Sequence, residues 1–404
     1  MNKIEVLTHA SSHHDAAELD ALKSKLLDDF RAVAEFDIKA VKKPSGDCLA
    51  VILVLTGGVE RDVLKTVAQL PAPSILIAHP GYNSLPASLE ILARIRRDGG
   101  DGRILFGDAA GIVPELQLEL VLATAWKGLR FSRIGLIGEP SEWLIASDVD
   151  PAFLKGRLAV DLITVDIKEL MDNIRSATVS RKELAAFTRK AEDIIGPNPE
   201  DIREAITVYR GLRALVDEHR LAACSVRCFD LVTDMHTTGC YALSRLNDEG
   251  IPAGCEGDLQ SLFSLYIASL LSKQVAFMGN IAEVDLENQV VRLAHCMCPL
   301  SMAMHYTVYT HFESDLGIGI SGTFPEGAYT MFRLGGERLD QLFVREGRLE
   351  SSEFRNDSCR TQLRIRMSEP VDELLHSPLG NHHILIPGHH RRAIEHFCQR
   401  HLQS

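Results

Sequence analysis

A helix, a turn and a short strand follow one another in CYALSRLNDEGIPAGCEGD, residues 240–258. The apolar residues of the first half have helical spacing, and Gly250 supplies the left-handed residue that commonly ends a helix. Residues 251–255 form a short apolar run that delivers Glu256 among small residues. A carboxylate at the end of a buried strand is costly unless a cation or a proton-transfer role compensates for it. Glu256 is therefore the first candidate functional residue.

The neighbours of Glu256 are small or acidic. Gly254 and Gly257 are expected to leave room for a ligand to approach the backbone. Asp258 would share a face with Glu256 if the chain is locally extended, and could then orient it, hold a histidine or act as a second carboxylate. The alternatives are that Asp258 caps the helix expected from Leu259, or that the whole Glu-Gly-Asp tripeptide is a surface loop.

The composition is that of a globular protein large enough for two or three domains, with 404 residues, 46% of them hydrophobic and 24% charged. The net charge of −12 argues against a nucleic-acid partner and suits an enzyme that acts on a neutral small molecule. Nine cysteines without paired spacing predict reduced thiols and a cytoplasmic protein. The first residues predict a strand rather than a signal peptide, and no apolar run reaches the roughly 18 residues that would span a membrane.

The first 130 residues alternate apolar strands with amphipathic helices, which predicts an N-terminal domain with a Rossmann-like parallel sheet. Turn residues follow several strands, but neither a dinucleotide-binding fingerprint nor a Walker loop is present, so a nucleotide is not indicated. The expected strands are 4–7, 49–55, 74–78 and 103–106, and the expected helices are about 15–31, 59–69, 85–97 and 114–127.

A second α/β domain is expected over residues 131–274, with a strand at 133–138, helices within 167–220, and a strand at 225–229 that ends at Asp230. Trp143 follows the first of these strands. Its ring could support a sugar, although a core position is an equally good interpretation.

Residues 275–404 predict a third, β-rich domain, because the chain changes to short alternating strands. The predicted fold class is thus α/β: two Rossmann-like parallel-sheet domains followed by a barrel-like C-terminal domain. The expected strands of this last domain are 275–278, 290–293, 306–309, 329–334, 341–344 and 361–366.

The segment around Glu256 resembles the L-fucose isomerase and L-arabinose isomerase superfamily, in which a small residue or Cys precedes Glu-Gly-Asp after a helix that carries Ser-Arg-Leu. The likeness has recognisable motifs over about residues 220–404. In that family the matching glutamate binds a divalent metal, usually manganese, and moves protons on the sugar. The resemblance therefore implies that Glu256 is both a metal ligand and the base.

The resemblance also implies the other metal ligands. The family has an acid where this chain has Asn280, and a neutral amide could coordinate an ion but could not act as a base. Residues 380–389 resemble the family's Asn-His-x(5)-Gly-His segment, which makes His382 the metal-binding histidine. The arabinose-type alignment would favour His383 instead. His383 and His389 are kept as candidates for substrate binding.

His295 is similar in position to a histidine that binds metal in the arabinose branch of the family. It is a candidate fourth ligand or substrate contact. A histidine at the end of a strand is otherwise a structural residue in most proteins, and that alternative stays open.

These residues predict a metal-dependent aldose–ketose isomerase that acts through an enediol, with Mn²⁺ or another divalent ion held by Glu256, Asn280 and His382. Such a reaction needs a base beside the first two sugar carbons and a cation for their oxygens. A sugar-binding homologue without catalysis, which Asn280 favours, and a sugar epimerase are the alternatives. The resemblance implies a homo-oligomer, a trimer or hexamer, and the sequence leaves the sugar open, including one with a modified terminal carbon.

Overall fold

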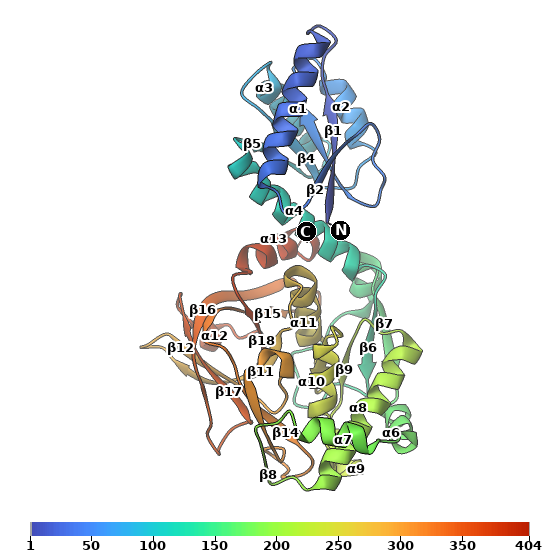
Figure 1. The fold of residues 1–404 in the computed structure, drawn as a ribbon, viewed down its shortest axis with the longest axis vertical. Helices are drawn as coiled ribbons and strands as arrows, with labels where there is room; N and C mark the ends of the chain where they lie inside the picture. Colours follow the sequence, from blue (N-terminus) through green and yellow to red (C-terminus); the bar gives the residue numbers. More distant parts are fainter. Residues whose placement is uncertain (1, 404) are drawn as a thin grey trace. The chain divides into compact units, whose positions relative to one another are not determined.

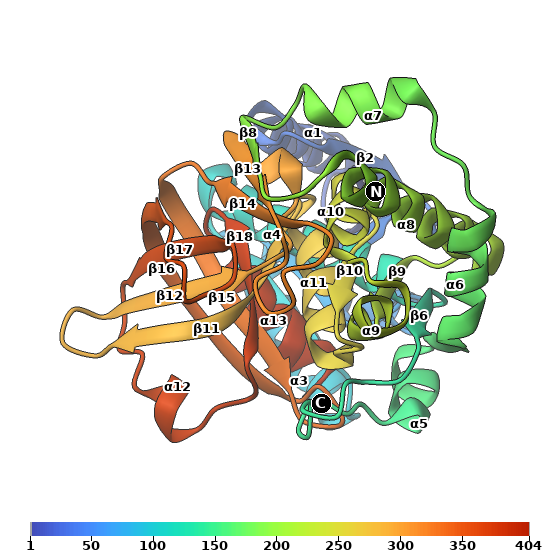
Figure 2. The same cartoon turned by 90° about the horizontal axis from the view of Figure 1, so that it is seen from below.

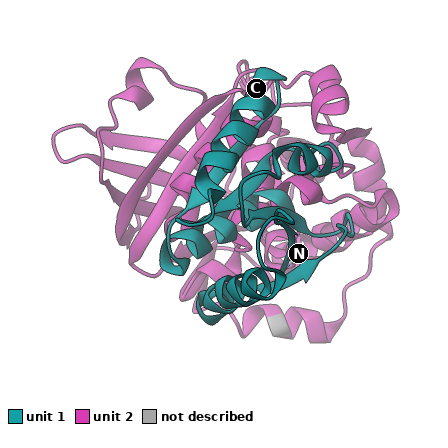
Figure 3. Cartoon of the chain, turned by 90° about the horizontal axis from the view of Figure 1, so that it is seen from above, with its two compact units in different colours: residues 1–124 teal, residues 125–404 magenta. Residues whose placement is uncertain are grey.

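The computed structural model describes residues 2–403. The chain divides into two compact units, residues 1–124 and 125–404 (Figures 1 and 3). The division falls inside helix α4 (Ala109–Leu129), close to the first predicted domain boundary. The second unit contains both a parallel sheet and a barrel, and its division at residue 274 stays a prediction.

The first unit is a five-stranded parallel sheet with strand order β2-β1-β3-β4-β5 (Figure 1). Helices α1 and α4 pack on one face of the sheet, and α2 and α3 pack on the other. The four predicted strands are present, while β2 was missed because most of its residues are exposed at the edge. The remaining elements are β1 (Lys3–His9), α1 (Ala16–Val33), β2 (Asp37–Val41), β3 (Leu49–Val54), α2 (Glu60–Val67), β4 (Ser74–Ala78), α3 (Ser84–Arg97) and β5 (Gly102–Phe106).

The second unit begins with a four-stranded parallel sheet in the order β10-β9-β6-β7. The strand predicted at 225–229 ends earlier than expected, at Val226. Asp230 therefore lies on helix α9 rather than at a strand end. The strands are β6 (Arg133–Ile137), β7 (Asp161–Val165), β9 (Ala223–Val226) and β10 (Ala253–Cys255). The helices are α5 (Pro151–Phe153), η1 (Leu154–Leu158), α6 (Ile167–Ser176), α7 (Arg181–Thr188), α8 (Pro199–His219), α9 (Phe229–Met235), α10 (Cys240–Asp248) and α11 (Leu259–Ser272).

The C-terminal half of this unit is a closed six-stranded barrel, β11-β12-β17-β16-β15-β18, which confirms the predicted fold class. The predicted strand at 306–309 belongs instead to a small separate sheet, β14-β13-β8. The barrel strands are β11 (Phe277–Asp285), β12 (Val290–His295), β15 (Gly327–Gly335), β16 (Gln341–Glu353), β17 (Thr361–Met367) and β18 (His382–Pro387). The other elements are β8 (Asp193–Ile195), η2 (Leu300–Met302), β13 (His305–Tyr309), β14 (Gly319–Thr323), α12 (Glu373–His376) and α13 (Arg391–His401).

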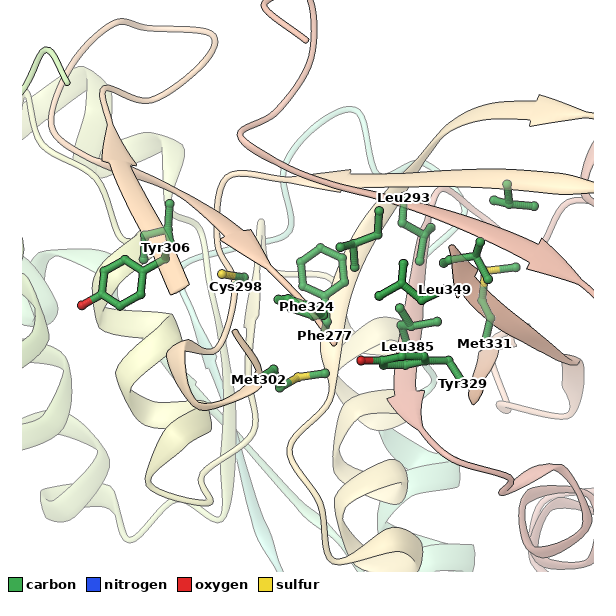
Figure 4. Close-up of a cluster of buried hydrophobic side chains, with 14 of the residues drawn as sticks. Phe277, Leu293, Cys298, Met302, Tyr306, Phe324, Tyr329, Met331, Leu349 and Leu385 are labelled. Atoms are coloured by element: carbon green, nitrogen blue, oxygen red, sulfur yellow. The ribbon is translucent and has the colours of Figure 1, made fainter. Parts of the chain in front are cut away.

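The barrel closes around apolar side chains. Phe277 and Phe324 meet edge to face at 5.5 Å, and Leu385 and Tyr329 lie in the same cluster (Figure 4). Helix α11 packs against both β15 and β18 of the barrel and against β9 and β10 of the parallel sheet (Figure 2). This almost wholly buried helix therefore joins the two sheets of the second unit. None of the helices within residues 2–403 has the length and apolar character needed to span a membrane.

The turn at Glu256 is built by two consecutive left-handed residues. Glu256 has φ 65° and Gly257 has φ 73°, so the chain reverses between β10 and α11. A side chain at Gly257 would lie 2.8 Å from the carbonyl oxygen of Glu139 and from Cα of Pro140. The space at Gly257 is therefore filled by a neighbouring backbone segment, and the expectation that it receives a ligand was wrong.

Gly257→Ala should destabilise the protein by about 2–5 kcal/mol, because it adds both a left-handed backbone penalty and a steric clash. Gly250→Ala is the matched control, since Gly250 has φ 78° but open space around it. That control should cost only about 1–2 kcal/mol. Urea-induced unfolding measures both values, and equal losses would contradict the close approach at Gly257.

Candidate active site

Five predicted site residues lie where the parallel sheet of the second unit meets the barrel. Glu256 follows β10, and Asp258 is the N-cap of α11. Asn280 on β11 pairs directly with His382 on β18, and on its other side it pairs with the residue before His295 on β12. The barrel register therefore brings three strands to the place where α11 begins.

His382 lies between two carboxylates and is 1% exposed. Its Nδ1 is 2.9 Å from Oδ2 of Asp258, and its Nε2 is 3.6 Å from Oε1 of Glu256. Burial lowers the pKa of His382, but its interactions with Asp258 and Glu256 outweigh burial and raise the pKa to about 9. The Nε2 atom has no hydrogen-bond partner within residues 2–403. An imidazole nitrogen held in this way, with a carboxylate behind it, is the usual arrangement of a metal-binding histidine.

Glu256 is ionised in this setting. Burial alone would raise its pKa, but the positive charge of His382 and a hydrogen bond from Trp143 lower the pKa to about 2. The Trp143 indole N–H donates to Oε2 of Glu256 at 2.6 Å. Its ring meets Phe229 edge to face at 4.9 Å and is half exposed. Trp143 therefore lies beside the catalytic candidate, and its predicted contact with a sugar stays a prediction.

Asp258 is fully buried and serves two of the roles that the sequence left open. It caps α11 by accepting from the N–H of Ser261, and it holds the imidazole of His382. Arg333 also lies 3.4 Å from its carboxylate. Burial raises the pKa of Asp258, but these partners outweigh it and hold the pKa well below its usual range. Asp258 lies behind the imidazole with all these partners, which suits it to orient His382, and its predicted catalytic role stays a prediction.

Arg333 is the main site-supporting residue that the sequence analysis missed. Its guanidinium is completely buried and donates to the backbone oxygen of His382 at 2.6 Å, to Ser261 at 2.7 Å and to Gln260 at 3.1 Å. A buried cation beside Asp258 compensates the second carboxylate of the cluster. A signal was available: Arg333 is the one charged residue in the otherwise apolar end of its strand.

His295 is neutral, and a hydrogen bond fixes its tautomer. It is 4% exposed, and its Nδ1 accepts the backbone N–H of Met297 at 3.1 Å. Burial, with the charge of His382, lowers its pKa to about 3. A neutral imidazole whose Nδ1 accepts must carry its proton on Nε2. His295 lines the pocket beside Glu256 and so offers it an N–H donor.

Three groups have the spacing of a metal site: Cys255, Glu256 and His295 each offer a ligand atom, all within 4.8 Å of one another. The hydrogen bond from Met297 leaves His295 without a free lone pair at Nδ1, which argues for a donor role rather than ligation. A carboxylate oxygen of Glu256 and the Sγ of Cys255 are the other two possible ligand atoms of this group.

Asn280 borders the same pocket, but the oxygen of its amide already has a partner. The amide of Asn381 donates to it at 2.6 Å. The structure thus brings Asn280 to the site, while its role as a ligand stays a prediction.

The pocket is lined by residues that the sequence analysis singled out and by others that it did not. Glu313, on the loop after β13, is among the latter, and burial together with the charge of Glu256 raises its pKa. The lining residues are Cys228, Phe229, Val232, Thr238, Gly239, Cys240, Cys255, Glu256, Asn280, His295, Cys296, His311, Glu313 and Cys359.

The structure does not bring His383 or His389 to Glu256. His383 is adjacent to His382 on β18, and it donates to the backbone of Asn381 at 3.0 Å and packs edge to face on Phe343. Burial lowers its pKa to about 3. His389 lies past the other end of β18, largely exposed, with Nδ1 2.9 Å from a carboxylate oxygen on β16. The alternation of side chains along β18 decides between the two adjacent histidines, and it places His382 at the site.

A parallel α/β sheet and a closed barrel meet at a buried acid–imidazole cluster beside a polar pocket. No protein-family model matches the chain. It is 23% identical over 318 residues to a sulfoquinovose isomerase of Alkalicoccus urumqiensis, covering 75% of this chain and 71% of that protein. It is 27% identical over 186 residues to a sulfoquinovose isomerase of Clostridium sp. (strain MSTE9), covering 44% and 41%.

These homologues indicate that the chain is an isomerase, which confirms the predicted enzyme class. They are also consistent with the predicted kinship to the L-fucose and L-arabinose isomerase superfamily, to which sulfoquinovose isomerase belongs.

Asp258→Asn should destabilise the protein by about 3–5 kcal/mol, because it leaves Arg333 and His382 buried without their shared carboxylate. Asp230→Asn is the matched control: Asp230 pairs with Arg227 at 2.8 Å, but both side chains are partly exposed. The control should cost at most about 1 kcal/mol. The free energy of unfolding in urea at pH 7 distinguishes the two, and a small loss at Asp258 would show that its partners do not depend on it.

Proposed function

We propose that this protein is a metal-dependent aldose–ketose isomerase whose substrate is sulfoquinovose, a hexose with a sulfonate on its terminal carbon. The sugar is taken from the names of both relatives. The observation that supports metal binding and the chemistry is the position of His382. Its Nδ1 is held by Asp258, and its Nε2 faces Glu256 and has no hydrogen-bond partner within residues 2–403. Cytoplasmic location and a trimer or hexamer stay predictions.

The donor set fits a divalent cation. Glu256 supplies a carboxylate and His382 an imidazole nitrogen, and hard or borderline divalent ions accept both. Asp258 would orient His382 from behind, as partners of metal-binding histidines do. A bound ion would polarise the sugar oxygens and stabilise the charge that they gain in the enediol. Manganese is one ion that such a set accepts.

Glu256 would carry the proton. The reaction moves a proton from C2 of the sugar to C1, while a proton passes from the C2 hydroxyl to the oxygen on C1. With His382 protonated, the pKa of Glu256 is about 2, which makes its carboxylate a weak base. A divalent ion at His382 would require the neutral imidazole, because only that form has a free lone pair on Nε2. The ion would itself keep the carboxylate of Glu256 ionised and able to accept the proton from C2.

His295 would assist by donating rather than by ligating. Its Nε2–H lies in the pocket wall beside Glu256, and its proton cannot shift to Nδ1 while Met297 donates there. A fixed neutral donor stabilises an oxygen that becomes negative in the enediol. This differs from the fourth-ligand role that the family resemblance offered.

The experiment is an assay of chelator-treated protein with sulfoquinovose, glucose, L-fucose and L-arabinose, with and without Mn²⁺. Ketose formation from sulfoquinovose that depends on the added ion supports the proposal. Sugar binding without turnover would favour a non-catalytic homologue, for which neutral Asn280 is the supporting feature, and an inverted aldose would favour an epimerase.

His382→Gln should abolish Mn²⁺ binding measured by calorimetry, and His383→Gln, the adjacent control, should retain it.

Replacing His295 tests whether this residue donates a hydrogen bond to the substrate or binds the metal ion. His295→Leu should lower kcat by about 10²–10³-fold, the effect of losing one oxyanion donor, with unchanged Mn²⁺ affinity. His295→Gln, whose amide N–H can stand in for Nε2–H, should recover part of kcat. A loss of Mn²⁺ affinity in both variants would instead make His295 a ligand.

A further inference from the structure

The amide of Asn280 has one end held by a neighbouring side chain and one end free. Its Oδ1 accepts a hydrogen bond from Nδ2 of Asn381 at 2.6 Å. Its own Nδ2 has no hydrogen-bond partner within residues 2–403, yet this nitrogen is accessible rather than buried. Asn280 lines the pocket beside Glu256, whereas Asn381 is exposed and lies outside the pocket lining. The oxygen therefore points toward Asn381, and Nδ2 is the end of the amide that can face the pocket.

A backbone group fixes this orientation. The N–H of Ile281 donates to Oδ1 of Asn381 at 3.2 Å, and it also lies 3.4 Å from the backbone oxygen of the same residue. A backbone N–H only donates, so the side-chain atom of Asn381 that faces it must be the oxygen. The other end of that amide is then the nitrogen, which also only donates and therefore requires the oxygen of Asn280 opposite it. The Ile281 N–H thus determines the orientation of both amides.

The barrel register places Asn280 beside the proposed ion. Asn280 is paired directly with His382 on the neighbouring strand, and the side chains of directly opposed residues lie on the same face of a sheet. The Nε2 of His382 is in turn 3.6 Å from Oε1 of Glu256. An amide N–H₂ group has no lone pair available for a cation, whereas a hydroxyl oxygen accepts a hydrogen bond from it.

We propose that Asn280 binds the sugar and not the ion: its Nδ2 donates a hydrogen bond to a hydroxyl oxygen of the sugar, and Asn381 is the positioning residue that holds the amide in this orientation. This inference rests on the proposed function and assigns one substrate contact within it. An acid at position 280, which the family resemblance would have, would place a further negative charge beside Glu256 and repel a sulfonated sugar. A neutral donor avoids that repulsion and supplies a hydrogen bond.

The test is calorimetry on the full-length protein with two probes. One is Mn²⁺, and the other is the sulfonated hexitol obtained by reducing sulfoquinovose, which has no carbonyl group and cannot be isomerised. Asn280→Leu should weaken binding of the hexitol to the Mn²⁺-loaded protein by about 10-fold, the effect of losing one hydrogen bond. Its affinity for Mn²⁺ should be unchanged, because the amide gives no ligand to the ion.

Asn381→Asp reverses the amide of Asn280 from outside the pocket. A carboxylate only accepts, so it keeps the hydrogen bond from Ile281 and turns the N–H₂ group of Asn280 toward itself. Binding of the hexitol should weaken by about as much as in Asn280→Leu, with Mn²⁺ binding retained. The double variant is the matched control for the added charge, because it should bind the hexitol no more weakly than Asn280→Leu alone.

Weaker Mn²⁺ binding by Asn280→Leu would make Asn280 a ligand and overturn the proposal, as would an unchanged affinity for the hexitol. An unchanged affinity in Asn381→Asp, or a further loss in the double variant, would overturn the positioning role of Asn381. A wild type that does not bind the hexitol would also overturn the proposal. The isomerase assay is separate: turnover of sulfoquinovose with unchanged hexitol affinity in the variants rejects only this inference, and the expected affinities without turnover reject only the proposed function.

Discussion

The imidazole of His382, buried between the carboxylates of Asp258 and Glu256, is the interaction on which the site depends. Two carboxylates this close and this buried would repel each other and lose their hydration. A positive group between them makes the arrangement stable, and Arg333 adds a second charge behind Asp258. A divalent ion in front of His382 would serve the same electrostatic need, so the proton on His382 and the ion are alternatives.

That interaction also lies where the two sheets meet. Asp258 begins α11, the helix that packs on the parallel sheet and on the barrel, while His382 begins the barrel strand β18. The hydrogen bond between the two side chains therefore spans the junction of the sheets. The left-handed backbone at Glu256 and Gly257 then turns the second carboxylate toward the other side of the imidazole. Fold and site depend on the same few residues.

Hydrogen bonds to the side chains, rather than residue types alone, determine which role each histidine can take at the site. His382 and His295 are both buried histidines, yet Nδ1 of His382 donates a hydrogen bond to a carboxylate, whereas Nδ1 of His295 accepts one from a backbone N–H. In its neutral form His382 has a free lone pair on Nε2, which suits a cation. His295 keeps an Nε2 proton and suits an oxygen that gains charge.

The sequence by itself determined the alternation of strands and helices and the β-rich C-terminal half, because periodicity is a local property. Glu256 and His382 were singled out by their resemblance to the motifs of the isomerase superfamily. Tertiary structure alone decided that Asp258 stands behind His382, that His383 faces away, that His389 lies at the far end of its strand, and that Arg333 supports the cluster. These outcomes depend on strand register and on contacts between residues far apart in the sequence, 124 positions apart for Asp258 and His382, which no local pattern encodes.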